Sequence, residues 1–376
     1  MPELLDALIN RRRPVDLDMC RAFWDRLDSR QLHPGEAAAM LACLSTHMPS
    51  TRAVKILIQS LDERRPEPHH RFPGAVNIVG TGGGPRTFNI STAAAFVAAA
   101  MGVPVVKTGS RGYTSRAGSF DLLDQLGIAL TTSYQQTGEM LDRYNIACAG
   151  YFVYPVELAA LSRAVAPLGM RTLGRFVNTV GPFLAAMPVS AQLIGVSEHS
   201  HLPTLRHLAA QQAPKRVWLC TNDLGVDELI SVVDDLVLDV GARQFPIQPH
   251  TLRLGGGTLS DLRAAADDRT TVEHFLGVLG GQGPAAAVAT VCLNAAALAV
   301  AAGATEDWAS AVSMAREAVD GGAAVDLVHR IQRDRVRVLS CGRPAATAPE
   351  AVRTEWRALA DLVRALRPTT AREPSI

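Results

Sequence analysis

The first 65 residues carry apolar side chains at helical spacing and no run that is typical of a strand. Because apolar positions recur three or four residues apart, we expect only helices here, with Asp16, Pro34 and Thr51 near three of the helix starts. The expected helices cover residues 3–11, 16–30, 34–47 and 51–65. A proline-rich connection at residues 66–73 then marks a domain boundary. The pattern therefore predicts a small helical domain at residues 1–66.

Beyond this boundary, short apolar runs alternate with helical segments. Such runs are typical of strands that are buried on both faces of a parallel sheet. The expected strands cover residues 75–79, 103–106, 146–153, 192–195 and 216–221. Their alternation with helices predicts an α/β domain at residues 74–340, with a mostly parallel central sheet flanked by helices. Residues 341–376 are rich in Ala, Pro and Arg, and we expect a partly disordered extension with one helix near residues 351–366.

Composition narrows the class of protein. The chain has 376 residues, of which 48% are hydrophobic, so it is long enough to bury one large core or a large and a small one. The net charge of +1 gives no support to nucleic acid or an acidic membrane surface as a partner. The six cysteines are scattered without a Cys-x-x-Cys pair, as is typical of free thiols in a reducing compartment. With no signal-peptide pattern and no apolar run long enough to span a bilayer, we expect a soluble cytoplasmic protein.

The candidate chemistry begins where the apolar run at residues 75–79 ends in GTGGG at residues 80–84. The NIST segment at residues 89–92 then offers capping side chains to an Ala-rich helix that extends to about Met101. A strand, a glycine turn and a helix N-terminus form an anion site, because unpaired backbone N–H groups point outward and the helix dipole favours negative charge. Further hydrogen-bond donors are the side chains of Thr87, Asn89, Ser91 and Thr92. The alternative interpretation is a tight turn with nothing bound.

Lys107 closes the apolar run at residues 103–106, and polar segments follow at residues 108–111 (TGSR) and 114–119 (TSRAGS). Because the carboxyl ends of parallel strands meet at one edge of a sheet, these groups and the glycine turn predict one polar crevice. Such a crevice suits a ligand with two or more phosphoryl groups, since lysine supplies a point charge and backbone N–H groups supply directional bonds. The chain lacks both the Gly-x-Gly-x-x-Gly fingerprint and the Gly-Lys-Ser/Thr loop here, which disfavours nicotinamide cofactors and ATP.

Two adjacent carboxylates, Asp227 and Glu228, come shortly after the expected strand at residues 216–221. Carboxylate oxygens are hard ligands of the kind that Mg²⁺ prefers, and bound Mg²⁺ usually shares its coordination with water and substrate phosphates. The alternative is an ordinary acidic helix start, because carboxylates also stabilise the N-terminus of a helix.

At these residues the chain resembles a known family. The stretches GTGGGPRTFNIST and VVKTGSRGYTSRAGSFDLLDQLGI, at residues 80–92 and 105–128, are similar to motifs of the anthranilate phosphoribosyltransferases. The family motifs read GTGGD, NIST and KHGNR-x-x-SS-x-x-GS-x-D-x-L-x-x-LG, and GVDEL at residues 225–229 resembles the family's GLDEL. The resemblance extends from about residue 3 to about residue 335. It implies Mg²⁺-dependent transfer of a 5-phosphoribosyl group from phosphoribosyl pyrophosphate to anthranilate, giving N-(5-phosphoribosyl)anthranilate and pyrophosphate in tryptophan biosynthesis.

The resemblance also implies roles for single residues. The phosphoribosyl donor would be held by Gly80, Thr81, Gly82, Gly83, Thr87, Asn89, Ser91, Thr92, Lys107, Gly109, Ser115 and Ser119. The acceptor would contact Gly80, Thr108, Ser110 and Arg171, and the metal would be held by Ser91, Asp227 and Glu228. No residue is assigned as an acid or base, because positioning of the reactants and stabilisation of the leaving group suffice for this reaction. A helix at about residues 155–182 would pack back on the helical domain, whose helices would form a homodimer contact.

The departures from the family motifs lie mostly on the acceptor side. Gly84 replaces the aspartate of GTGGD, and Thr108 and Ser110 replace the histidine and asparagine of KHGNR. The family's His-Pro motif is missing after residues 146–153, and Arg171 lies at a shifted position. The loss of His and Asn removes polar contacts worth about 1 kcal/mol or more each. Two alternatives therefore stay open: a paralogous phosphoribosyltransferase with another aromatic or heterocyclic acceptor, and a non-catalytic, nucleic-acid-binding relative of the same fold.

Overall fold

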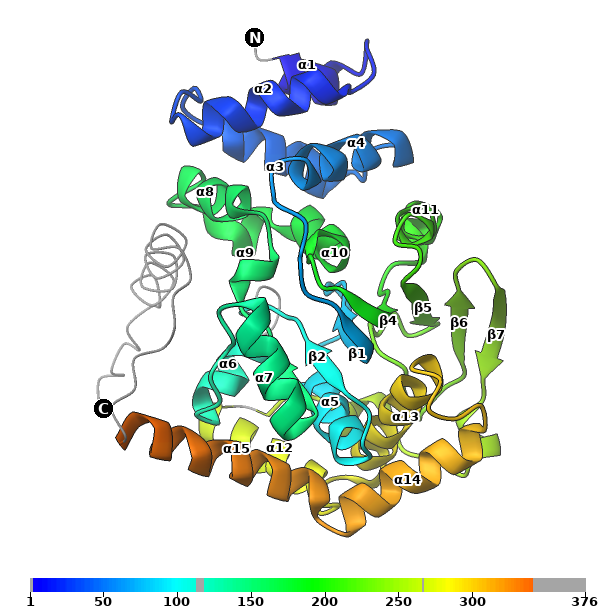
Figure 1. The fold of residues 1–376 in the computed structure, drawn as a ribbon. Helices are drawn as coiled ribbons and strands as arrows, with labels where there is room; N and C mark the ends of the chain where they lie inside the picture. The colour runs from blue at the N-terminus through cyan, green and yellow to red at the C-terminus, as the bar shows by residue number, and fades with distance from the viewer. Residues whose placement is uncertain (1–2, 113–117, 266, 341–376) are drawn as a thin grey trace, which may run out of the picture.

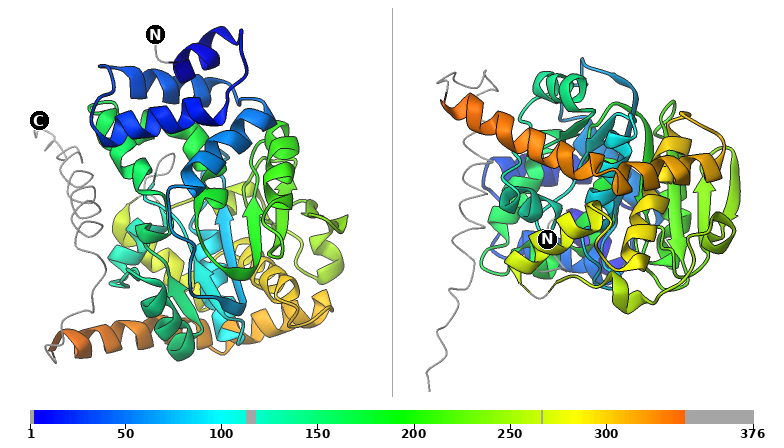
Figure 2. Two further views of the ribbon diagram at one scale, coloured as in Figure 1. Left: turned by 45° about the horizontal axis from the view of Figure 1, so that its top comes forward. Right: turned by 90° about the horizontal axis from the view of Figure 1, so that it is seen from below.

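The computed structural model describes residues 3–112, 118–265 and 267–340 (Figure 1). Helices from two parts of the chain gather at the end of the molecule that contains the N-terminus, and we call them the helical bundle (Figure 1, Figure 2). They are α1 (Glu3–Asn10), α2 (Leu17–Asp28), α3 (Glu36–Thr46), α4 (Thr51–Asp62), α8 (Val156–Ala164), α9 (Gly169–Leu173) and α10 (Arg175–Leu184). The helices expected before residue 65 are confirmed. Of the expected starts, Asp16 caps α2 by accepting from the Met19 N–H at 2.9 Å.

The single helix expected at about residues 155–182 is wrong, because this segment forms the three helices α8, α9 and α10. Gly169 starts α9 with a φ of 72°, a conformation that favours glycine. Gly174 separates α9 from α10, and a Cβ at this position would overlap the Met170 carbonyl oxygen. The segment nevertheless packs back on the N-terminal helices, as expected.

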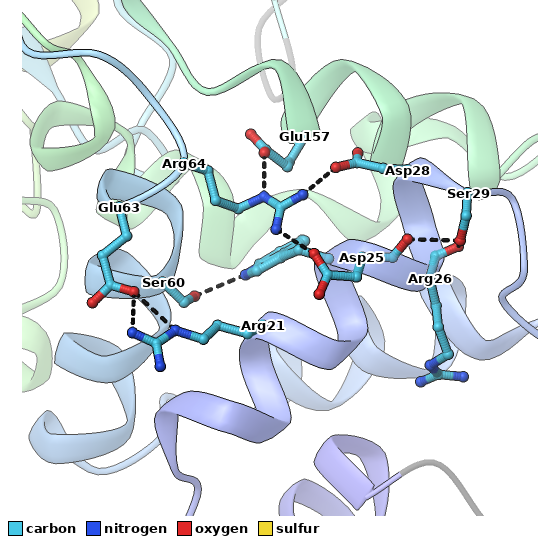
Figure 3. A network of polar contacts seen from close by, with 10 residues as sticks. Arg21, Asp25, Arg26, Asp28, Ser29, Ser60, Glu63, Arg64 and Glu157 are labelled. Atoms are coloured by element: carbon cyan, nitrogen blue, oxygen red, sulfur yellow. Dashed lines mark hydrogen bonds and ion pairs between the residues drawn. The ribbon is translucent and has the colours of Figure 1, made fainter.

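Ion pairs join the two parts of the bundle, and we call this group the Arg64 cluster (Figure 3). Arg64 follows α4 and donates to Glu157 Oε1 at 2.6 Å, to Asp25 Oδ1 at 2.6 Å and to Asp28. Asp25 and Asp28 lie on α2, whereas Glu157 lies on α8 and is buried. One guanidinium group therefore holds three elements of the bundle together.

Within the described residues, a seven-stranded sheet with the order β3-β2-β1-β4-β5-β6-β7 forms the centre of the rest of the chain. Its strands are β1 (Phe72–Gly80), β2 (Val105–Lys107), β3 (Ile146–Cys148), β4 (Val189–Gly195), β5 (Arg216–Asn222), β6 (Asp235–Asp239) and β7 (Arg243–Ile247). The pairs from β3 to β5 are parallel, whereas β6 and β7 are antiparallel. The mostly parallel sheet is therefore confirmed. The antiparallel pair was not expected. β7 contains Pro246, which an edge strand tolerates but which makes a strand hard to predict from sequence.

The strand expected at residues 146–153 is shorter than predicted. It ends at Cys148 and a 3₁₀ turn follows at Tyr151–Val153. Between them, Gly150 passes so close to the Thr131 carbonyl oxygen that a Cβ would overlap it. The chain therefore leaves the sheet at this glycine.

Helices cover both faces of the sheet (Figure 1). They are α5 (Ile90–Ala100), α6 (Ser119–Gln125), α7 (Tyr134–Tyr144), α11 (Leu202–Ala210), α12 (Asp268–Leu279), α13 (Ala285–Ala301), α14 (Trp308–Asp320) and α15 (Ala323–Ser340). Along β1, Val76 and Ile78 belong to the core that includes α5 and α13, whereas Val79 belongs to the core of the helical bundle. This split follows from the alternation of side chains along a strand. Because the bundle core continues into the sheet, the division at residues 66 and 74 stays a prediction.

The direction in which strands are added to the sheet reverses between β1 and β4. From β1 the chain continues to β2 and β3 on one side, and it then returns to β4 and β5 on the other side. Gly80 and Gly195 are paired in register at the carboxyl ends of β1 and β4. Open parallel sheets bind ligands beyond the carboxyl ends of their strands at such a switch point.

No helix in the described part of the chain is both long enough and apolar enough to cross a membrane. The extension expected at residues 341–376 lies outside the described residues.

Candidate active site

Asp227 lies over the carboxyl ends of β1 and β4. Gly80 and Gly195 leave the space for it, because a Cβ at either position would overlap Asp227. The Gly82 N–H donates to Asp227 Oδ2 at 2.7 Å. The structure thus brings the glycine loop at residues 80–84 together with one of the two carboxylates predicted to bind a metal.

The glycine loop has a shape that side chains at its centre would disturb. Gly82 and Gly83 have φ values of 69° and 88°, which favour glycine. Ser197, just after β4, holds the loop by donating from its hydroxyl to the Gly82 carbonyl oxygen at 2.6 Å. A Cβ at Gly84 would overlap the Gly225 carbonyl oxygen. The aspartate that ends the family's GTGGD motif therefore has no room at residue 84 while the Gly225 backbone keeps this position.

The N-terminus of α5 is left open toward this loop. The expectation that the NIST segment caps the helix is not met by its N-cap residue, since Asn89 makes no side-chain capping bond. The hydroxyl oxygen of Thr92 is buried without a hydrogen-bond partner among the described residues, and Ser91 is half-buried beside it. Because buried polar atoms are rarely left unpaired, an open helix start with an orphaned hydroxyl is consistent with a place for a ligand.

Lys107 ends β2 and is almost completely buried. Its Nζ donates to the Thr108 carbonyl oxygen at 2.5 Å. Burial lowers the pKa of the amine to about 8, although the nearby Cys148, Glu228 and Asp227 favour the charged form. The lysine therefore lies close enough to Asp227 and Glu228 for their charges to affect its pKa. This proximity agrees with the single polar crevice predicted from the sequence.

Burial also disfavours the charged forms of Asp227 and Glu228, which are carboxylates. Burial raises the pKa of both carboxyl groups, that of Glu228 well above its ordinary value, and the charge of Asp227 raises the pKa of Glu228 further. The nearby Thr87 hydroxyl favours the charged form of Glu228 and lowers its pKa, but Glu228 Oε2 is buried without a partner among the described residues. A buried carboxylate pair beside one lysine, with an oxygen left unbonded, is costly unless a cation completes it.

Two residues that the sequence did not indicate hold the backbone around these carboxylates. Asn222 Nδ2 donates to the Val226 and Glu228 carbonyl oxygens at 3.1 and 3.0 Å, and to Asp235 Oδ1 at 3.0 Å. The Asp235 carboxylate in turn accepts from the Ile230 N–H at 3.1 Å. Asn222 comes directly after the strand expected at residues 216–221, but no local pattern marks it or Asp235 as a support of the carboxylates.

On the predicted acceptor side, Thr108 contacts the sheet. Its hydroxyl accepts from Asn77 Nδ2 at 2.8 Å, its N–H donates to Asn77 Oδ1 at 3.1 Å, and both residues are completely buried. The side chain of Thr108 is thus occupied within the protein. A direct contact with an acceptor stays a prediction that this geometry does not favour.

The other predicted residues of this stretch lie at two places. Gly109 contacts Ser119 so closely that a Cβ at Gly109 would overlap the serine hydroxyl, and Ser119 Oγ donates to the Ser110 carbonyl oxygen at 3.4 Å. Arg171 is exposed on α9, and its Nη2 lies 3.5 Å from the Gly112 carbonyl oxygen. The helical bundle thus places an arginine beside the loop that carries Ser110. Ser115 lies outside the described residues.

The structure also contains a cavity of about 650 Å³ at the opposite edge of the sheet, where β1 and β4 begin. Its lining includes Arg65, Phe72, Val189 and Lys215, and none of the predicted site residues.

Over the described ranges, no group of three or more His, Cys, Asp and Glu side chains is arranged to hold a metal ion by itself. A metal in the crevice would therefore take its remaining ligands from hydroxyls, water or a substrate.

Comparison with known proteins agrees with this geometry. A family model described as "Glycosyl transferase family, a/b domain" matches residues 73–325. An anthranilate phosphoribosyltransferase of Methylorubrum extorquens is 32% identical over 333 residues, which cover 86% of this chain and 96% of that protein. The enzyme of the same name from Bacillus licheniformis is 27% identical over 340 residues, covering 89% of this chain and 98% of the relative.

Solved structures show the same relationship. The crystal structure of anthranilate phosphoribosyltransferase from Thermus thermophilus has a TM-score of 0.73 and 28% identity, covering 89% of this chain and 99% of that one. The Saccharomyces cerevisiae enzyme in complex with PRPP and Mg has a TM-score of 0.70 at 19% identity, covering 88% and 96%, and supports the fold alone. From the family match, the identity and the coverage together, the chain belongs to this glycosyl transferase family, with anthranilate phosphoribosyltransferases as its relatives.

Proposed function

We propose that this chain transfers the 5-phosphoribosyl group of phosphoribosyl pyrophosphate to anthranilate, giving N-(5-phosphoribosyl)anthranilate and pyrophosphate. The observation that carries the proposal is the placement of Lys107, Asp227 and Glu228 beside the glycine loop at the switch point of the sheet. The family match and the names of the relatives support the same reaction.

The crevice suits the phosphoribosyl donor. The Thr81 and Gly82 N–H groups are engaged within the protein, so the directional bonds to phosphate oxygens would come from the N–H groups of Gly83 and Gly84 and from the open N-terminus of α5. Lys107 offers a positive charge in a buried place, where electrostatic attraction is stronger than in water. These groups would orient the donor for the reaction.

In the reaction, the bond from the acceptor nitrogen to the ribose anomeric carbon forms as the bond to pyrophosphate breaks. The electron pair leaves with pyrophosphate, and the amine releases its proton. Negative charge therefore builds on the leaving group, and Lys107 and the loop N–H groups stabilise it there. Single preorganised contacts of this kind contribute about 10²–10³ in rate.

The residues in the crevice fit Mg²⁺. Asp227 and Glu228 supply carboxylate oxygens, Glu228 Oε2 is buried without a partner among the described residues, and Ser91 supplies a hydroxyl. We propose these three as the metal-holding residues. When bound, Mg²⁺ would neutralise charge on the pyrophosphate group.

The acceptor side differs from the donor side, because Thr108 is already occupied by Asn77. We propose Arg171 as the partner of the anthranilate carboxylate, since it is a cation beside the loop that carries Ser110. A second candidate function is transfer to a different aromatic or heterocyclic acceptor, and the engaged Thr108 is the observation that favours it. We further propose that the protein acts in the cytoplasm as a homodimer formed through its helical bundle.

Calorimetric titration with phosphoribosyl pyrophosphate and Mg²⁺, followed by loss of anthranilate fluorescence in the same sample, tests the proposal. We expect both donor binding and anthranilate consumption. Donor binding without consumption would move the assignment to the second candidate. If the donor does not bind, both candidates fall, and nucleic-acid binding by a non-catalytic relative becomes the hypothesis to test.

A further inference from the structure

Helix α13 is apolar along its length except at two positions. Its sequence, AAAVATVCLNAAALAVA, contains Thr290 and Asn294 as the polar side chains. The two are four residues apart and therefore lie on one face of the helix. Both are completely buried, and a polar group in such a place is costly unless it is fully hydrogen-bonded. The positions of these two side chains therefore call for a physical reason.

The partners of this face lie in the segment 226–231, which carries Asp227 and Glu228. Asn294 binds both backbone groups of Leu229: its Nδ2 donates to the Leu229 carbonyl oxygen at 2.7 Å, and its Oδ1 accepts from the Leu229 N–H at 3.3 Å. One turn earlier, Thr290 Oγ1 accepts from the Ser231 N–H at 3.0 Å. Ser231 Oγ donates to the Ala286 carbonyl oxygen at 3.1 Å, one further turn along the helix.

The segment is thus held from two sides in alternation. Asn222 and Asp235 bind backbone groups of residues 226, 228 and 230 from the sheet, whereas α13 binds those of residues 229 and 231. Because the segment is neither helix nor strand, it has no backbone ladder of its own to fix it. Hydrogen bonds from these side chains therefore fix the backbone of the segment.

We infer that Asn294 is a positioning residue, which fixes the backbone at Leu229 and thereby directs the carboxylate of Glu228 into the crevice. The inference rests on the proposed function, because Glu228 is one of the proposed metal-holding residues. Thr290 does not share this role to the same degree, since its bond lies two residues further along the chain, at Ser231.

The geometry makes this role specific to an amide at residue 294. The amide carries its acceptor and its donors on separate atoms, so its oxygen accepts from the Leu229 N–H while its nitrogen donates to the Leu229 carbonyl oxygen. The Asn294 amide also donates to the Thr290 carbonyl oxygen of its own helix at 2.8 Å, which holds its orientation. An alanine here keeps the helix, because it has the best helix propensity, but removes all three bonds.

The test measures how donor affinity depends on Mg²⁺. The affinity of the full-length protein for phosphoribosyl pyrophosphate is determined by calorimetry over a series of Mg²⁺ concentrations, together with the melting temperature. For Asn294→Ala we expect the Mg²⁺ concentration at half-maximal effect to rise about tenfold, as is usual when the support of a metal ligand is removed. The matched control is Thr290→Val, which removes a buried hydrogen bond from the same face and should shift that concentration less than about twofold at a similar loss of melting temperature.

A double-mutant cycle with Glu228→Gln separates positioning from general stability. If Asn294 acts through Glu228, then Asn294→Ala should have no further effect on the Mg²⁺ requirement in the Glu228→Gln protein. Additive effects, or an equal shift in Thr290→Val, would overturn the inference while leaving the proposed function intact. If Asn294→Ala does not fold, Asn294→Ser replaces it, because its hydroxyl still offers one bond to Leu229. A wild-type protein whose donor binding ignores Mg²⁺ would instead overturn the metal assignment, and the inference with it.

Discussion

The Arg64 cluster and the crevice beside β1 pair their buried carboxylates in opposite ways. In the cluster, one guanidinium meets three carboxylates, and each of its nitrogens donates to one of them; Glu157 is buried, whereas Asp25 and Asp28 are exposed. In the crevice, two carboxylates share the neighbourhood of one lysine, whose amine donates to a backbone carbonyl instead. Glu228 Oε2 and the Thr92 hydroxyl are left without partners among the described residues.

This difference in pairing distinguishes charged groups that stabilise the fold from charged groups whose partners are supplied by a ligand. Removing one partner of a buried, hydrogen-bonded ion pair is destabilising, because the other charge is left buried without compensation. A buried charge with unbonded oxygens lowers the stability of the free protein and gains its partners only on binding. The two regions should therefore respond to neutral substitutions in opposite ways.

The largest effect is expected for Asp227→Asn. The amide can still accept from the Gly82 N–H but has lost the charge, so the rate of phosphoribosyl transfer should fall about 1,000-fold. The free energy of unfolding should stay the same or rise, because a buried charge has been removed. Initial rates and urea denaturation measure the two quantities. In the matched control Glu157→Gln, the rate should be unchanged and the stability lower; the reverse pattern would break the comparison.

Lys107→Met is the second substitution in the crevice. Methionine keeps most of the apolar stem but removes the charge, so we expect the affinity for phosphoribosyl pyrophosphate to fall about 10- to 100-fold, the usual range for a charged hydrogen bond. Stability should not fall, since burial already disfavours the charged amine. Calorimetry of donor binding and a thermal melt test both statements. An unaltered donor affinity would remove Lys107 from the site.

Arg64→Met tests the other region. It leaves Glu157 buried without its cation and disconnects α4 from α2 and α8, so the free energy of unfolding should fall by about 2 kcal/mol. The rate per folded molecule should stay within about twofold of wild type. Denaturation curves and initial rates at a temperature well below melting decide this. A large loss of rate without loss of stability would mean that the cluster belongs to the catalytic machinery.

Asp235, which supports the backbone around the crevice, should make the stability of the folded protein depend on pH. Burial raises the pKa of its carboxyl group to about 8, so the folded protein holds a proton there that the unfolded chain has released above about pH 4. The free energy of unfolding therefore decreases as the pH rises above about 4, and the decrease is complete above the pKa of the folded state. The difference in unfolding free energy between Asp235→Asn and wild type should therefore rise by up to about 1.4 kcal/mol between pH 6 and pH 7. A difference that does not change with pH would show that the carboxylate is ionised in the folded state.

Local patterns in the sequence predicted much of the crevice. The apolar run before GTGGG placed β1, the lysine after the next run placed Lys107, and the GVDEL segment marked Asp227 and Glu228. Each of these signals lies within a few consecutive residues and depends on one strand end or turn. The capping role expected of Asn89 was wrong, because the helix start is left open instead of being satisfied locally.

Local sequence patterns could not predict the contacts that support the crevice and the helical bundle. Asn294 and Leu229 are 65 residues apart, and Arg64 and Glu157 are 93 residues apart. Their contacts depend on how elements pack, which periodicity does not encode. One signal was present, since two polar residues four apart on an apolar helix indicate a polar partner, but it did not identify that partner.

The smallest effect is expected for Arg21→Met, which sharpens the comparison within the bundle itself. Arg21 Nη2 lies 2.6 Å from Glu63 Oε2, the distance that also separates Arg64 from Glu157 Oε1, but Arg21 and Glu63 are exposed whereas Glu157 is buried. Solvent and salt screen such a pair, and ordering two long side chains opposes its attraction. The melting temperature of Arg21→Met should therefore match that of wild type, and at high salt the two curves should coincide. If Arg21→Met instead melted as early as Arg64→Met, then distance alone and not burial would set the strength of these pairs.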